Sequence, residues 1–405
     1  MMKYSPIFLI SLLIMFAACK KVNEDNENPN NAELPETEYA YTIAGTNQSV
    51  FYDNDSEINK PAEGEDFYGQ NAHFPGRQFN YRDNGDGTVT DLVTGLMWQA
   101  GLPELKYTYE EAVVYAESAS LAGYDDWRLP TIKELYSLMQ FSGSTGMSAE
   151  TSVPYIDTDY FEFRYGDEYN PQERYIDVQF ASTSVYTGTV MNGQHAMFGL
   201  NLADGRIKAY PLNKDFEVKL VRGNTAYGIN DFVDNGDGTI SDLATGLMWE
   251  QAGSAAGMLW KDALAWVQQK NQENYLGYSD WRLPDAKELQ SIVDYSRSPD
   301  ATASAAIDPL FNVPQIEDEW SDPDYPFYWT STTHVDGPTP NKAVYIAFGR
   351  ALGFFPDGST LQDVHGAGAQ RSDPKSGNPG DYPSGFGPQG DVIRIYNYVK
   401  CVRGM

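Results

Sequence analysis

Two short segments, 88–98 and 239–249, are rich in apolar and β-branched residues. Each directly follows an Asn-Gly-Asp-Gly sequence. Asn-Gly and Asp-Gly pairs supply the positive φ angles that a tight hairpin requires, and the β-branched residues after them favour strands. A Thr-Gly pair at 94–95 and at 245–246 marks a second turn. This pattern predicts a β-hairpin or meander at the start of each half of the chain.

Helical patterns follow each predicted meander. The segment 108–119 has helical character, and its Thr108 and Glu111 have the spacing of a capping box. The segment 259–270 is its counterpart in the second half, with a less clear cap. We therefore expect a first helix in each half.

A second pair of helices is predicted directly after the two Trp-Arg-Leu-Pro segments. Thr131 with Glu134, and Asp285 with Glu288, have the capping-box spacing. Apolar residues then fall on one helical face, namely Ile132, Leu135, Leu138 and Met139. The remainder of each half reads as strands and long loops. Each half thus predicts an α+β fold with a hairpin or meander, two helices and irregular β-structure.

The two halves are copies of one sequence. The segment 83–98 recurs at 234–249 with 13 of 16 residues identical, and 123–135 recurs at 277–289 with 10 of 13 identical. Each copy also ends on a matching strand, VKLVRG or VKCVRG. Because the interval of about 151 residues is the length of a whole domain, we predict tandem domains. Their expected bounds are 66–224 and 225–405, with a Gly- and Pro-rich insert at about 357–391 in the second domain alone.

The N-terminus predicts a lipoprotein. An apolar run at 7–18 follows Lys3 and is too short to span a bilayer, so residues 1–18 are interpreted as a signal peptide. The sequence Ala-Ala-Cys resembles a lipobox, which implies cleavage after residue 18 and lipid on Cys19. Plain secretion is the alternative. Lys20 stands where some inner-membrane lipoproteins have Asp, so the expected location is the cell envelope, at the outer membrane.

Residues 19–65 predict an acidic flexible tether. Within it, 39–52 has enough aromatic and β-branched residues for a strand. Over the whole chain, 28 Lys and Arg against 57 Asp and Glu give a net charge of −29. This charge excludes a nucleic-acid partner and leaves the lipid anchor as the expected membrane contact. The second of the two cysteines, Cys401, is expected to be buried.

The repeated motifs DNGDGT, GYxDWRLPxxKEL and VKxVRG together resemble the Lcl C-terminal domain family, a domain of unknown function named after a collagen-like adhesin. They also resemble the C-type-lectin-like fold shared with formylglycine-generating enzymes. The resemblance implies two tandem C-type-lectin-like domains on a bacterial surface protein. Formylglycine-generating activity needs a cysteine pair, which is absent, so that activity is excluded. The namesake is associated with glycosaminoglycan binding, but a chain this acidic is not expected to bind a sulfated polyanion.

No catalytic set is recognisable, since HExxH, CxxC and GxSxG are absent and the four histidines are scattered. The Asp residues of the two hairpin turns could instead hold Ca²⁺, because hard cations prefer carboxylates on Gly-containing turns. These residues are Asp83, Asp86, Asp91, Asp234, Asp237 and Asp242. However, the EF-hand register fails. The favoured interpretation has no cofactor, and the Asp side chains bond their own backbone.

Two further groups of residues bear on the question of a site. Trp127, Arg128, Trp281 and Arg282 are interpreted as structural, with the arginines paired to an Asp or a carbonyl. Aromatic loops offer ligand contacts through Tyr160, Tyr165, Trp320, Tyr325 and Tyr328. The leading hypothesis is a non-catalytic surface protein that binds a glycan or a protein. An enzyme acting on polysaccharide through a carboxylate pair and a structural subunit of a surface assembly are the alternatives.

Overall fold

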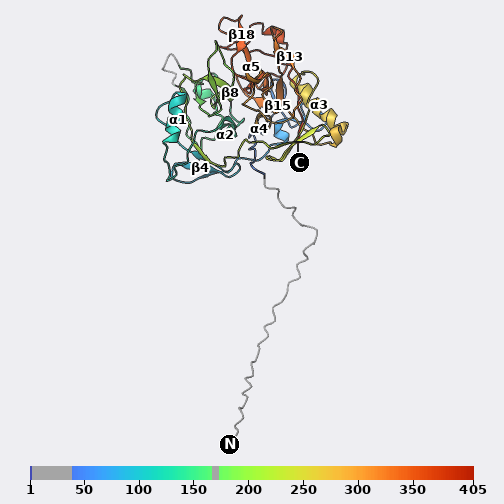
Figure 1. Ribbon diagram of the computed structural model, residues 1–405. Helices are drawn as coiled ribbons and strands as arrows, with labels where there is room; N and C mark the ends of the chain where they lie inside the picture. The colour runs from blue at the N-terminus through green and yellow to red at the C-terminus, as the bar shows by residue number, and fades with distance from the viewer. Residues whose placement is uncertain (2–38, 167–172) are drawn as a thin grey trace. The chain divides into compact units, whose positions relative to one another are not determined.

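Two stretches of the chain, residues 39–166 and 173–405, are described in the computed structural model together with Met1 (Figure 1). Residues 39–405 fold as one unit. The predicted signal peptide beyond Met1, the lipidation site Cys19 and residues 20–38 lie outside the described residues. No helix in the described stretches is both long and apolar enough to cross a membrane.

Each copy begins with a three-stranded antiparallel meander, to which the closing strand of the same copy adds a fourth strand. The turns use left-handed glycines, for example Gly85 at φ 74° and Gly87 at φ 86°, which is why Asn-Gly-Asp-Gly occurs there. Copy one uses β3 (Tyr81–Asp83), β4 (Thr88–Asp91), β5 (Leu96–Gln99) and β9 (Val221–Gly223). Copy two uses β10 (Phe232–Asp234), β11 (Thr239–Asp242), β12 (Leu247–Glu250) and β20 (Val402–Gly404).

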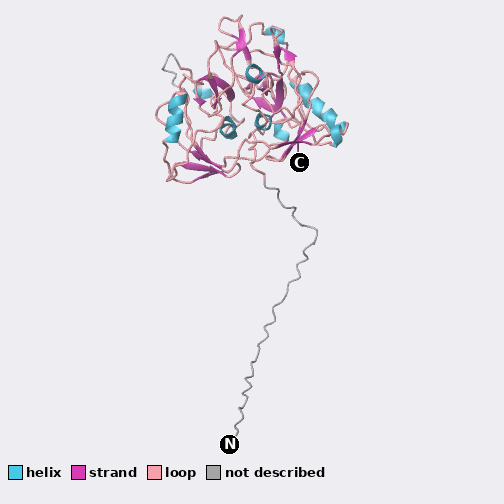
Figure 2. Ribbon diagram, in the orientation of Figure 1, coloured by secondary structure: helices cyan, strands magenta, loops and turns pink. Residues whose placement is uncertain are grey.

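The helices lie where their caps predict them (Figure 2). Thr108, Thr131 and Asp285 each form a complete capping box, whereas the N-cap of α3, Leu259, has no side-chain hydrogen bond. The helices are α1 (Tyr109–Glu117), α2 (Ile132–Ser137), α3 (Trp260–Gln272), α4 (Ala286–Ser291) and the short α5 (Pro299–Thr302). The fold is α+β, as the sequence indicates.

One six-stranded antiparallel sheet is shared by both copies, in the order β15-β16-β19-β8-β7-β6. The copies meet where β19 pairs with β8 through Gln370 and Ile207. The strands are β6 (Gln179–Phe180), β7 (Ala196–Asn201), β8 (Arg206–Pro211), β15 (Phe327–His334), β16 (Lys342–Ala347) and β19 (Gln370–Pro374). Shorter pairs are β1 (Phe51–Tyr52) with β2 (Glu57–Ile58), β13 (Ile316–Glu317) with β14 (Pro323–Asp324), and β17 (Leu352–Phe354) with β18 (Leu361–Asp363).

Two lysines, half-buried Lys133 and buried Lys287, join the copies reciprocally. Helices α2 and α4 lie side by side (Figure 1). Lys133 Nζ at the start of α2 donates to the carbonyl of Ser291, the last residue of α4, at 2.6 Å. Lys287 Nζ at the start of α4 donates to the carbonyl of Ser137, the last residue of α2, at 2.7 Å. Each Lys of the Lys-Glu-Leu motif therefore stabilises the C-terminal end of the other copy's helix.

The segment that leads into each copy packs on the other copy. Residues 64–69 precede copy one but contact α3 of copy two, where Gly64 N donates to Gln268 Oε1 at 3.0 Å and Lys261 pairs with Asp66 at 2.6 Å. Residues 227–230 precede copy two but contact α2 of copy one, since Lys133 Nζ donates to the Gly228 carbonyl at 3.1 Å. The tandem thus resembles an intramolecular dimer with exchanged leading segments.

The predicted flexible tether is wrong for residues 39–65. Tyr41 is buried, and its ring packs at a tilt against that of Tyr227, with ring centroids 4.8 Å apart. Gln48 is also buried; its Nε2 donates to the Thr333 carbonyl at 2.8 Å, and its Oε1 accepts from Thr333 N at 2.9 Å. Although these residues are polar on average, they find specific partners in the folded body, which composition alone does not reveal.

Candidate functional site

The repeated motifs bind one another and hold each copy together. In copy one, Arg222 of the closing Val-Arg-Gly strand donates from Nε to Asp126 Oδ1 at 2.6 Å. The same guanidinium lies 3.7 Å from the ring centroid of Tyr124. Arg403 repeats both contacts in copy two, with Asp280 at 2.7 Å and the Tyr278 ring at 4.2 Å. In each copy, the Arg of the closing motif and the Asp and Tyr of the Gly-Tyr-x-Asp-Trp motif therefore stabilise the fold by contacting one another.

The Trp-Arg pairs are equally engaged. Trp127 and Trp281 are buried, and each indole Nε1 donates to a backbone carbonyl. Arg128 forms a two-point ion pair with Glu134, and Arg282 forms the same pair with Glu288. The partner differs from the expected Asp or carbonyl, because it is the capping-box Glu of the following helix. That Glu thereby caps the helix and neutralises the arginine at once.

A buried lysine two residues before each closing strand was not predicted from the sequence. Lys219 Nζ donates to the carbonyls of residues 99, 100 and 101 at 3.1–3.3 Å. Lys400 Nζ makes the same contacts with residues 250–252 in copy two. Burial lowers the pKa of Lys219 to about 7 and that of Lys400 to about 8. Recurrence of the Lys in both VKxVRG motifs was the signal that could have found it. Cys401, beside Lys400, is buried.

The hairpin aspartates accept hydrogen bonds from their own turns. Asp83 Oδ1 accepts from Gly85 N at 2.8 Å, and Asp86 Oδ1 accepts from Thr88 N at 3.1 Å. Asp91 is buried on the adjoining turn. Asp234, Asp237 and Asp242 repeat these contacts in copy two. Among the described residues, no group of three or more metal-ligating side chains could hold an ion. The structure therefore does not assemble the aspartates into a calcium site.

The five aromatic candidates occupy different environments. Tyr328 is fully buried because β15 is covered on both faces, so its proposed ligand contact is wrong. Tyr160 and Tyr165 are half-buried against the core. Tyr325 is half-buried too, and its hydroxyl donates to the Ala303 carbonyl at 3.1 Å. Trp320 is 54% exposed in the connection of the β13–β14 hairpin.

Two arginines hold this hairpin to the body of copy two. Buried Asp324 on β14 accepts from Arg350 N at 3.0 Å and lies 3.6 Å from the Arg394 guanidinium. Arg394 also donates from Nε to Glu319 at 2.9 Å. Because these contacts approach Asp324 from two sides, they fix the hairpin and the exposed Trp320 in place.

A cleft of about 550 Å³, here called the aromatic cleft, lies along one side of the hairpin. Rings of Tyr396, Tyr398, Tyr382, Phe354 and Phe327 line it, and the Tyr396 side chain is 48% exposed. Polar lining comes from Glu317, Glu319, Arg394 and Asn397. Asn397 is buried in the wall of the cleft, and its Oδ1 is not accessible from it. Exposed rings beside polar groups that can hydrogen-bond are the features of a ligand site.

The insert predicted at 357–391 forms one wall of the aromatic cleft through Pro379, Tyr382 and Pro383. On the other side of the hairpin, a second cleft of about 430 Å³ contains Trp320 together with Asp318, Asp322 and Arg350. The hairpin therefore separates two clefts, and the insert supplies residues to both.

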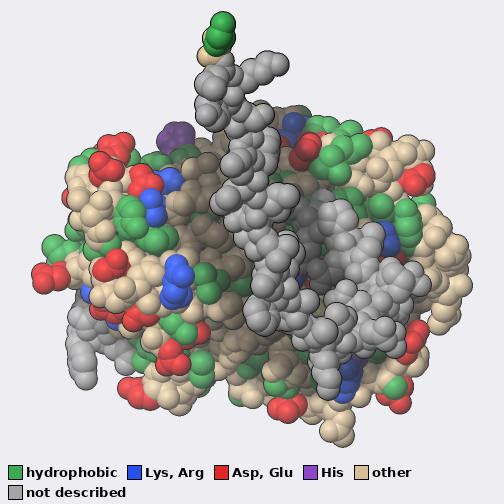
Figure 3. Space-filling view, turned by 90° about the horizontal axis from the view of Figure 1, so that it is seen from below, with side chains coloured by type: hydrophobic (Ala, Val, Ile, Leu, Met, Phe, Trp, Pro, Cys, Tyr) green, Lys and Arg blue, Asp and Glu red, His purple; other side chains and the backbone are tan. Residues whose placement is uncertain are grey.

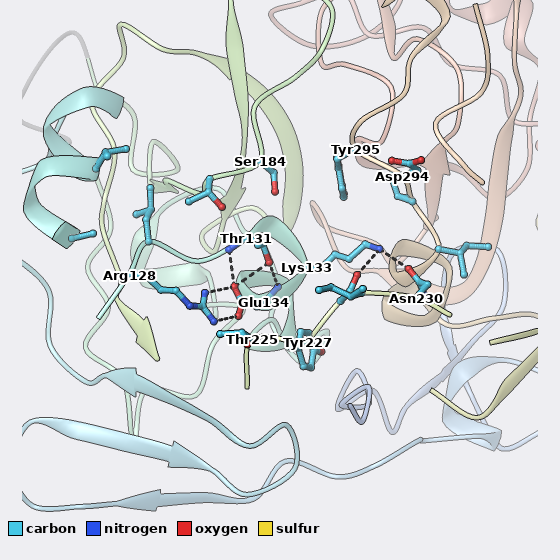
Figure 4. A pocket seen from close by; sticks show the side chains of 18 of the residues that line it. Arg128, Thr131, Lys133, Glu134, Ser184, Thr225, Tyr227, Asn230, Asp294 and Tyr295 are labelled. Carbon is cyan, nitrogen blue, oxygen red and sulfur yellow. Dashed lines mark hydrogen bonds and ion pairs between the residues drawn. The ribbon is translucent and has the colours of Figure 1, made fainter. Parts of the chain in front are cut away.

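A larger cleft of about 750 Å³ lies where the two copies meet (Figure 4). Its basic groups already have partners within the fold. Arg128 pairs with Glu134, while Lys133 donates to Asn230 Oδ1 at 2.9 Å and to two carbonyls. It also lacks the exposed rings of the aromatic cleft, so we place the candidate binding site in the aromatic cleft.

Charged side chains on the face shown in Figure 3 are dispersed, with acidic groups between the scattered Lys and Arg. The part of that face where described residues are visible gives a polyanion no continuous basic surface.

Together, the shared sheet and the repeated motif contacts define a tandem α+β repeat protein. The chain belongs to the Lcl C-terminal domain family, whose model matches residues 87–222 and 238–361. Neither curated proteins nor solved structures gave a match. The second match ends at residue 361, so the insert residues that line the aromatic cleft lie outside the segment shared with the family.

Proposed function

We propose that this protein is a non-catalytic binding protein of the cell envelope that holds a glycan in the aromatic cleft of copy two. The observation that carries the proposal is the exposed Tyr396 ring in a cleft with carboxylate and guanidinium groups. Sugar rings present apolar faces that stack on aromatic rings and hydroxyls that bond to such polar groups. The resemblance to C-type-lectin-like domains supports the same function.

Substitution of Tyr396 or Tyr382 by alanine is expected to weaken glycan binding at least tenfold. Each substitution removes a stacking surface, and a tenfold change corresponds to about 1.4 kcal/mol. The ligand would be selected by screening the mature chain on a glycan array, and affinities would then be measured by isothermal titration calorimetry. Phe74→Ala is the matched control, because Phe74 is an exposed aromatic residue that does not line the cleft.

The alternatives give different outcomes. Wild-type affinity in both tyrosine variants would place the ligand elsewhere, and the Trp320→Ala variant then tests the cleft across the hairpin. Turnover of the bound oligosaccharide would favour the enzyme that uses a carboxylate pair. The absence of glycan binding together with capture of a surface protein would favour a protein ligand or a structural subunit.

We also propose that Cys19 carries the lipid that anchors the protein in the outer membrane, on the basis of the short apolar run and the Ala-Ala-Cys sequence. A Cys19→Ser variant is expected to move from the membrane fraction to the soluble fraction. Mass spectrometry of the N-terminal peptide would detect the lipid on the wild-type protein alone. An unmodified wild-type N-terminus would favour plain secretion.

A further inference from the structure

A small cavity of about 40 Å³ lies between strand β8 of copy one and the end of the insert in copy two. Three basic side chains line it, those of Arg174, Lys208 and Lys214, against one carboxylate, Asp177. The chain as a whole has twice as many acidic as basic residues. The cavity therefore has the opposite charge balance from the rest of the molecule.

The carboxylate that contacts the Lys208 ammonium group is shared with a second cation. Lys208 Nζ contacts Asp204 Oδ2 at 3.3 Å, and Arg206 contacts the same oxygen, also at 3.3 Å. Burial, followed by the nearby Arg371 and Arg206, lowers the pKa of Lys208 to about 7. An anion in the cavity would stabilise the protonated lysine.

Arg174 and Tyr210 line the same space. The Tyr210 hydroxyl is fully buried and is not accessible from the cavity, so Tyr210 contributes its ring to the wall. Arg174 pairs with Asp177 through Nη2 at 2.6 Å and through Nε, while over half of its side chain remains exposed.

Other lining groups do not offset this balance. Asp177 and Arg174 neutralise each other as an ion pair, so Lys208 and Lys214 carry the remaining positive charge of the lining. His365 also lines the cavity; its Nε2 lies 2.8 Å from Asp391 Oδ1, and burial lowers its pKa well below the ordinary value, so it is neutral at pH 7. The cavity exceeds the roughly 10–15 Å³ that one water needs and is small enough to select a single compact group.

We infer that this cavity, which both copies build, is a binding site for one compact oxyanion, a carboxylate, phosphate or sulfate group. Lys208 and Lys214 supply positive charge, and Arg174 closes the exposed side. The site shares no lining residue with the aromatic cleft. Its failure would therefore leave the glycan proposal standing, and failure of the glycan proposal would leave this site standing.

Calorimetric titration of the mature chain with sulfate, inorganic phosphate, acetate and glucuronate, at constant ionic strength, tests the inference. At least one of these probes is expected to bind saturably at one site per chain. Preference for phosphate or sulfate would identify a phosphorylated or sulfated ligand, whereas preference for glucuronate or acetate would identify a carboxylate.

The exposed position of Lys214 and the half-exposed position of Arg174 allow substitutions that leave the core intact. Lys214→Met and Arg174→Met are each expected to weaken binding at least fivefold. Lys60→Met is the matched control, since Lys60 is exposed and lies outside the cavity. Absence of saturable binding for all four probes, or equal weakening by Lys60→Met and Lys214→Met, would overturn the site.

Discussion

Replacing Glu288 by alanine is expected to lower the free energy of unfolding by about 3–5 kcal/mol, the usual cost of leaving one member of a buried ion pair without its partner. Glu288 accepts from both terminal nitrogens of Arg282, and it also accepts from the backbone N of Asp285 at 3.0 Å. The substitution therefore leaves a guanidinium and the backbone N–H of Asp285 without their partner. Urea denaturation followed by circular dichroism measures the change.

The same substitution in copy one is expected to have a smaller effect. Arg128 is 30% exposed in its side chain, against 17% for Arg282, so water can solvate Arg128 more readily once Glu134 is removed. Both losses should exceed that of Glu111→Ala by a wide margin. Glu111 completes the capping box of α1 in the same way but has no arginine partner and is exposed.

A double substitution separates the two contributions. Arg282→Met with Glu288→Met removes both charges, so it should recover most of the stability lost by Glu288→Ala, because paired buried charges can be replaced by apolar groups at little cost. If Glu111→Ala were as destabilising as Glu288→Ala, the capping box and not the ion pair would be responsible. Wild-type stability of Glu288→Ala would contradict both explanations.

Local features of this fold were predictable because they depend on neighbours in sequence. The capping boxes at Thr131 and Asp285 join residues three apart, and the glycines of the hairpin turns are required by backbone conformation alone. Contacts between the copies were not predictable in this way. Lys133 meets Ser291 across 158 residues, and Gln48 meets Thr333 across 285. No periodicity in a single sequence reveals such partners.

The candidate site was likewise predictable only in part from the sequence. The aromatic composition of 320–329 indicated a ligand surface, but it could not distinguish exposed Trp320 from buried Tyr328. All eight residues of β15 are buried, so the alternation that would identify an inward face is absent. Tyr382 was overlooked because its segment was interpreted from Gly and Pro content. Its place in the cleft depends on the path of the insert, which the sequence does not specify.

Separating the two copies is expected to abolish cooperative folding of each. The segment 39–224 expressed alone would expose the β8 edge, lose the partner of Lys133 at Ser291, and leave Gln48 without Thr333. The segment 225–405 would lose the contacts of residues 64–66 with α3 and the partner of Lys287 at Ser137. A buried polar group that loses its hydrogen-bond partner lowers the free energy of unfolding by about 1–3 kcal/mol. The total free energy of unfolding of a protein is only roughly 5–15 kcal/mol.

Thermal unfolding by circular dichroism and binding of a hydrophobic dye would be compared for each half, for the intact chain and for the two halves produced together. We expect no cooperative transition and strong dye binding for each half alone, and recovery of a single transition when the halves are combined. Lys287→Met in the intact chain should give an intermediate loss, since it removes one reciprocal contact and leaves the shared sheet. A cooperative transition of 39–224 near the intact melting temperature would show that the copies fold independently and that their junction is only a contact between finished domains.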